Sequence, residues 1–135
     1  MGAWGVLAFD NDEANDWAYG LDVVSDLSLV DNAFRKVETS RGRYLEQGDA
    51  VEALAACEVV ARLRDRSGYT NAYTKKVDEW VAKHPIVPSR ELISRGSAVI
   101  DRILGSDSEL SELWEEAGAG EWQGAVADLR TRMTG

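Results

Sequence analysis

The sequence has almost none of the residues that crosslink a chain or bind metals. Cys57 is the only cysteine and His84 the only histidine among 135 residues. A single cysteine excludes a disulfide within the chain and is typical of a protein in a reducing compartment. The usual zinc sites need several cysteine or histidine ligands, so they are excluded too. We therefore expect a cytoplasmic protein and predict no metal centre and no cofactor.

Positive charge is also scarce. The chain has 15 Lys and Arg against 24 Asp and Glu, a net charge of −9. A partner bound through phosphates requires a basic face, so this charge argues against nucleic acid. It favours instead a partner protein with a basic surface. The sequence leaves the oligomeric state open.

Long apolar runs and catalytic motifs are missing as well. No stretch reaches the ~20 apolar residues of a membrane span, and Met1 is not followed by the basic and apolar regions of a signal peptide. There is no G-x-S-x-G motif, phosphate-binding loop or dinucleotide fingerprint. We expect neither a membrane protein nor a secreted one, and no common catalytic constellation is visible.

The sequence does contain strong helical periodicity. Apolar residues recur at helical spacing, and no segment alternates convincingly at period two. We predict helices at residues 12–23, 28–38, 50–63 and 71–83, one after Ser89 that closes at Gly105, a short one started by Ser106 and Glu109, and a last one that carries Trp122 and Met133. The pattern predicts an all-α fold, a single compact domain over residues 1–135 with six or seven helices and an extended N-terminal segment.

The alanine-rich stretch at residues 50–63 is the strongest of these predictions. Asp49 and Glu52 have the spacing of a capping box, and the stretch is apolar on nearly every side. Such a helix is usually buried, so we expect it at the centre of the domain. We interpret Cys57 on this helix as a small buried hydrophobe, because a reactive thiol needs exposure. His84 is expected to be partly buried at the end of its helix.

Three aspartates near the N-terminus are candidate binding residues. Asp12 and Asp16 lie four residues apart and share a helix face, and Asp10 can fold over from the helix cap. Such carboxylates could hold a hard cation, which makes a metal-dependent, hydrolase-like enzyme the alternative function. The spacing is not that of an EF-hand loop. We favour the interpretation that these acids cap the helix and complement its positive end.

Trp4 is the fourth candidate binding residue. The other four tryptophans lie on apolar helical stripes and are expected in the core, whereas no helix accounts for Trp4. We expect its ring to be buried and to anchor the N-terminal segment onto the helices. An exposed ring would instead indicate a binding surface, since Trp is enriched at interface hot spots.

The opening of the chain, Met1-Gly2-x-Trp4-Gly5-x3-Phe9-x-Asn11-Asp12-x-Ala14-x-Asp16-Trp17, resembles an uncharacterised bacterial family, domain of unknown function 4259. The stretches at residues 50–63, 108–114 and 128–130, and Trp122, are similar to it too, while residues 67–88 match least well. The resemblance implies a small, mostly helical bacterial protein and assigns no activity to any residue.

From these observations we expect a non-enzymatic interaction module. It would present an acidic helical surface to a partner protein, because the chain combines a net charge of −9 with a compact helical frame.

Overall fold

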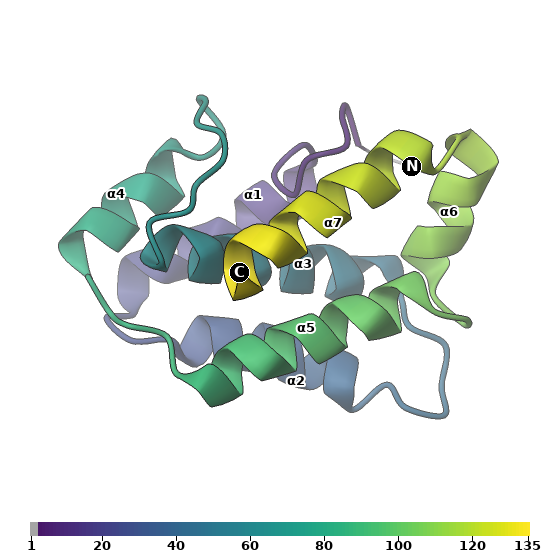
Figure 1. Ribbon diagram of the computed structural model, residues 1–135, viewed down its shortest axis with the longest axis horizontal. Coiled ribbons are helices and arrows are strands. Elements are labelled where there is room, and N and C mark those ends of the chain that lie inside the picture. The colour runs from purple at the N-terminus through teal and green to yellow at the C-terminus, as the bar shows by residue number, and fades with distance from the viewer. Residues whose placement is uncertain (1–2) are drawn as a thin grey trace.

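Helices dominate residues 3–135, the part of the chain that the computed structural model describes (Figure 1). These residues contain isolated bridges but no β-strand. The elements are α1 (Asp12–Ala18), the 3-10 helix η1 (Tyr19–Val23), α2 (Ser28–Glu38), α3 (Gln47–Leu63), α4 (Lys75–Lys83), α5 (Arg90–Leu104), α6 (Glu109–Ala117) and α7 (Gly120–Thr134). The prediction of a single all-α domain is confirmed.

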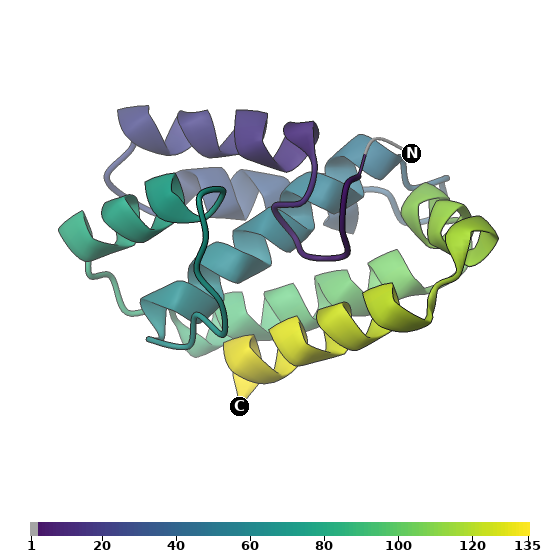
Figure 2. The ribbon, with the colours of Figure 1, turned by 90° about the horizontal axis from the view of Figure 1, so that it is seen from above.

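The alanine-rich helix α3 lies at the centre of the molecule. It packs against each of the other six α-helices, and Figures 1 and 2 show it enclosed by them. Every residue from Ala53 to Arg62 is buried. The alanines allow this, because small side chains let neighbouring helices approach from several sides at once. The predicted central position is confirmed.

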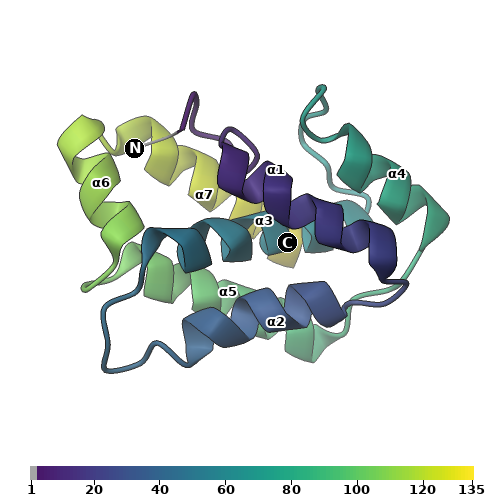
Figure 3. The same cartoon turned by 180° about the vertical axis from the view of Figure 1, so that it is seen from behind.

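The remaining helices surround α3. In Figure 3, α1 and α4 lie on one side of α3, with α2 and α5 on the other. Helix α7 runs beside α5 and α3, and α6 closes one end of the molecule (Figure 2). No helix in the described part of the chain has the length and apolar character needed to cross a bilayer.

Several predicted helix boundaries are correct because a local cap determines them. The side chain of Asn11 accepts a hydrogen bond from the Ala14 amide and starts α1. Ser89 does the same for the Leu92 amide at the start of α5, as its position predicted. The span predicted at residues 12–23 is also helical, although its last five residues adopt the tighter 3-10 form.

Other predicted boundaries were wrong. Helix α3 begins at Gln47, before the proposed Asp49 cap, because the carboxylate of Glu109 accepts a hydrogen bond from the Gln47 amide. Helix α6 is preceded by Ser108 and not by Ser106. Helix α4 begins at Lys75, later than predicted. Before it, the Asn71 side chain accepts hydrogen bonds from the Tyr73 and Thr74 amides. These bonds hold the backbone in a turn that competes with a helix.

Candidate functional site

The N-terminal segment folds into a short closed loop ahead of α1. The Trp4 amide donates to the Asp10 carbonyl at 2.9 Å, and the Asp10 amide donates to the Leu7 carbonyl at 3.0 Å. The carboxylate of Asp10 accepts from the Leu7 amide at 3.0 Å. A Cβ at Gly5 would collide with this carboxylate, so a larger residue would not fit there without displacing Asp10.

The expectation that Trp4 is buried was wrong. Its side chain is 49% exposed, whereas Phe9 is 1% exposed and occupies the core. The turn in the loop sends Phe9 inward as the apolar anchor and leaves Trp4 on its outer side. The Trp4 ring packs instead on Tyr73, with ring centroids 5.1 Å apart and planes tilted by 46°. Tyr73 is itself 47% exposed, so two loops distant in sequence form one exposed aromatic pair.

The three aspartates take different positions and do not converge. Asp10 is engaged with the Leu7 amide, while Asp12 and Asp16 are exposed on α1. Within residues 3–135, no group of three Asp, Glu, His or Cys side chains has the arrangement of a metal site. Asn11, and not an aspartate, is the cap of α1, and Asp12 lies in its first turn. The geometry therefore offers no support for the aspartate-based enzyme that the sequence left open.

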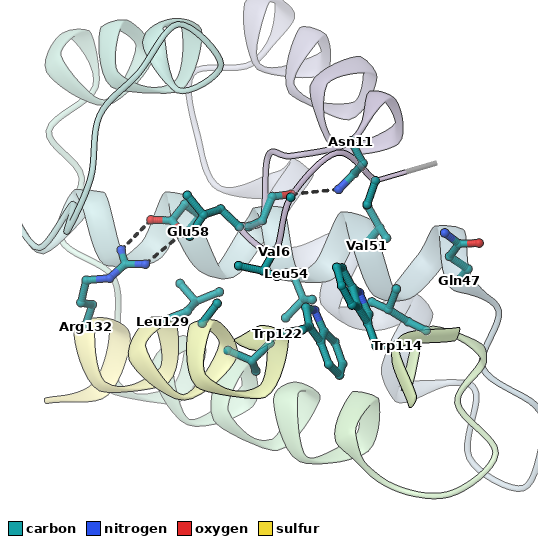
Figure 4. A pocket seen from close by; sticks show the side chains of 17 residues that line it. Val6, Asn11, Gln47, Val51, Leu54, Glu58, Trp114, Trp122, Leu129 and Arg132 are labelled. Atoms are coloured by element: carbon teal, nitrogen blue, oxygen red, sulfur yellow. Dashed lines mark hydrogen bonds and ion pairs between the residues drawn. The ribbon is translucent and has the colours of Figure 1, made fainter. Parts of the chain in front are cut away.

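A narrow pocket lies between the N-terminal loop and helices α3, α6 and α7 (Figure 4). Trp114 and Trp122 line it as a parallel stack, with ring centroids 5.9 Å apart. Its free volume is about 40 Å³, room for very few water molecules and far below the ~300–1,000 Å³ of a small-molecule site. In this conformation the pocket is too small to hold a substrate or a cofactor.

A buried network of charged side chains lies at one end of the pocket. Glu58, in the middle of α3, is 1% exposed. Its two carboxylate oxygens accept from the Arg132 guanidinium at 2.6 and 3.1 Å (Figure 4). Arg62 lies one turn further along α3, with its Nε 3.3 Å from Glu58 and its Nη1 2.6 Å from Asp78. The network joins α3, α4 and α7 through opposite charges in a region with little water, where each charge needs its partner.

Tyr69 packs between the two arginines of this network. Its ring centroid lies 4.9 Å from the guanidinium carbon of Arg62 and 5.7 Å from that of Arg132. The Tyr69 hydroxyl is buried and has no hydrogen-bond partner within residues 3–135. Burial raises the pKa of this hydroxyl, and the Glu58 carboxylate raises it further, so Tyr69 remains protonated at neutral pH.

The model of the family described as domain of unknown function (DUF4259) matches residues 2–125. The chain belongs to this family. Searches of curated proteins and of solved structures found no match to the chain. Membership of DUF4259 therefore agrees with the resemblance of the N-terminal motif and assigns no activity.

The two residues that sequence reasoning had assigned to structure keep that role in this DUF4259 protein. Cys57 is fully buried in α3, and burial raises the pKa of its thiol, which keeps it protonated and unreactive. His84 stacks on Trp80 with centroids 4.7 Å apart, and its Nδ1 lies 2.9 Å from the Trp80 carbonyl oxygen. The predicted interpretation of both residues is confirmed.

Sequence reasoning missed two parts of the candidate site. Glu58 lies on an otherwise apolar helix face four residues before Arg62, and an acid–base pair at that spacing in such a helix indicates a buried ion pair. Arg62 is 4% exposed and belongs to the same network. The Trp4–Tyr73 pair had no sequence signal, because its two members lie in separate loops.

Proposed function

We propose that this protein is a non-enzymatic interaction module of the cytoplasm that binds a basic segment of a partner protein. The binding surface consists of Trp4 and Tyr73 with the exposed carboxylates of Asp12 and Asp16 on the adjoining helix, while Asp10 holds the loop in shape. The observation that carries the proposal is the exposed Trp4–Tyr73 pair, with rings 5.1 Å apart on neighbouring loops.

An exposed pair of this kind is suited to recognition. Trp and Tyr are the residues most enriched at binding hot spots, and their ring faces attract Lys and Arg side chains. Trp4 is bonded through its backbone to Asp10, and α1 with Asp12 and Asp16 begins directly after this loop. Aromatic faces beside carboxylates favour a cationic side chain over a neutral or anionic one.

The acidity of the whole chain supports the same partner class. A net charge of −9 attracts a basic protein from a distance and raises its association rate, an effect that falls as salt is added. The aromatic contacts are less sensitive to salt. Binding through this surface should therefore weaken with ionic strength and also require Trp4.

The test is affinity capture from a bacterial extract with the immobilised protein, at low and at high salt. Trp4→Ala is compared with Tyr44→Ala, a matched control because Tyr44 is 50% exposed on a different loop. A partner of this surface is retained by wild type and by Tyr44→Ala and is lost with Trp4→Ala and with Asp12→Asn/Asp16→Asn. Trp4→Ala should cost only about 1 kcal/mol of stability, the contribution of one exposed aromatic pair. If no retained protein depends on Trp4 and on salt, the proposal is wrong.

A further inference from the structure

A groove on the opposite side of α3 from α1 carries excess positive charge. It runs between the C-terminal end of α2 and helix α5, which pack against each other (Figure 3). Its volume is about 410 Å³, within the ~300–1,000 Å³ typical of binding sites. Arg41, Arg95 and Arg102 line it against a single acidic residue, Glu38, in a chain whose overall charge is −9.

Two of these arginines have no carboxylate partner. Arg95 is neutralised, since it donates to both oxygens of Glu38 at 2.8 and 2.9 Å and to Asp31 at 2.6 Å. Arg102 donates only to backbone carbonyls, those of Arg43, Ser106 and Asp107. Arg41 is exposed, and neither it nor Arg102 forms an ion pair within residues 3–135.

Nearby acids do not compensate these two charges. Asp101, next to Arg102 in the sequence, accepts from Arg130 at 2.6 Å. A comparable hollow beside α1, of about 450 Å³, shows the contrast. Its cations Arg35 and Lys36 each pair with a carboxylate, Asp31 and Glu52 respectively. Two unpaired cations therefore distinguish the groove between α2 and α5 from the hollow beside α1.

Apolar residues form the floor of the groove. Val37, Ala98 and Val99 line it, and of these Ala98 is exposed, whereas Val37 and Val99 are buried. Ser94 and Arg102 lie at its two ends on α5, eight residues apart, which corresponds to ~12 Å or just over two helical turns. The groove therefore combines apolar residues with cations along its edge. An amphipathic helix that carries acidic residues beside its apolar stripe matches this shape and charge.

We propose that this groove binds an acidic amphipathic helical segment of a partner protein. Apolar side chains of the segment pack on Ala98, the exposed apolar residue of the groove, and its carboxylates accept hydrogen bonds from Arg41 and Arg102. This site shares no residue with the Trp4–Tyr73 surface and selects the opposite charge. Failure of one proposal therefore leaves the other unaffected.

The test uses a short capped peptide with leucine and glutamate at helical spacing, labelled for fluorescence anisotropy, and the same peptide with glutamine in place of glutamate. Wild type should bind the glutamate peptide and bind the glutamine peptide at least about tenfold more weakly, because each charge-assisted hydrogen bond contributes roughly a factor of ten. Arg41→Gln should weaken binding of the glutamate peptide by about tenfold. Ala98→Glu, which adds an anion to the exposed floor, should weaken it further.

Arg43→Gln is the matched control. Like Arg41, Arg43 is exposed in the loop between α2 and α3, but it does not line the groove. Its substitution by glutamine removes the same charge. It should change the affinity by less than about twofold, the effect expected of a screened charge outside the groove. Circular dichroism of each variant checks that the fold is retained.

Four results would overturn the proposal. The first is no binding of the glutamate peptide, and the second is equal losses for Arg41→Gln and Arg43→Gln. The third is displacement of the peptide by inorganic phosphate at equal concentration, which would assign the groove to small anions. The fourth is a wild-type dimer in sedimentation that Arg41→Gln disperses, which would assign it to a second copy of the chain.

Discussion

At the scale of single residues, Glu58 is a buried acid held by two arginines. It is 1% exposed and bonded to Arg132, with Arg62 beside it. Such a carboxylate contributes little net stability compared with an apolar core, because burying it costs nearly as much as its pairs return. Removing the Glu58 charge, in contrast, lowers stability, because Arg62 and Arg132 then lose their shared partner.

We therefore expect Glu58→Gln to lower the free energy of unfolding by about 3 kcal/mol, at the lower end for broken buried pairs because Asp78 and Asp128 still contact the arginines. Urea denaturation followed by circular dichroism measures the change. Asp128→Asn is the control: Asp128 bonds the same Arg132 but its side chain is 65% exposed, so the loss should stay below about 1 kcal/mol. Equal losses for the two variants would show that the burial of Glu58 does not account for the effect of its substitution on stability.

At the scale of helices, Gly96 determines how closely α5 approaches α7 and α2. A Cβ at this position would lie 2.7 Å from the Met133 sulfur and 3.2 Å from Cζ of Phe34, and both side chains are fully buried. Gly124, on α7, is the opposite case, because a Cβ there meets no atom within 4 Å. The same residue type therefore serves a packing role in one helix and none in the other.

Alanine substitution should have opposite effects at these two glycines. Gly96→Ala gains ~1 kcal/mol of helix propensity but overpacks the interface by ~1–3 kcal/mol, so we expect a net loss of about 1 kcal/mol. Gly124→Ala should gain up to ~1 kcal/mol, since only propensity changes. Thermal denaturation of both variants measures the difference. A gain for Gly96→Ala would mean that Met133 repacks freely and that the helices are less tightly joined than the distances indicate.

At the scale of the molecule, one central helix organises the others. Helix α3 packs against all six remaining α-helices, whereas α6 packs mainly against α3 and α5 and contacts α7 through the Trp114–Trp122 stack. Opening α3 therefore disrupts every interface that it makes, while α6 can open with few losses. Stability is thus distributed unevenly over the molecule.

Hydrogen exchange should reveal this distribution. We expect amides in the middle of α3 to exchange only through global unfolding, and amides of α6 and of residues 66–74 to exchange earlier through local opening. Mass spectrometry of exchange in increasing urea measures the two regimes. Exchange of α3 as early as α6 would contradict the central role of α3.

The sequence by itself determined the helical class, the position of most helices and the burial of α3. Apolar spacing, and caps such as Ser89, act over a few residues and can be read directly. The boundary at Gln47 was missed because it depends on a contact with Glu109, 62 residues further along the chain. The one at Lys75 was missed because the local turn around Asn71 was not recognised. The single cysteine and histidine were likewise interpreted correctly, because their helix faces were sufficient to show burial.

Only the tertiary structure decided where the candidate sites lie. Trp4 meets Tyr73, Glu58 meets Arg132, and Arg41 and Arg102 line one groove, each pair joining segments far apart in the chain. Residue spacing fixes which side chains share a helix face, but not which faces meet. That choice depends on how α3 distributes its neighbours, which is a property of the packed chain as a whole.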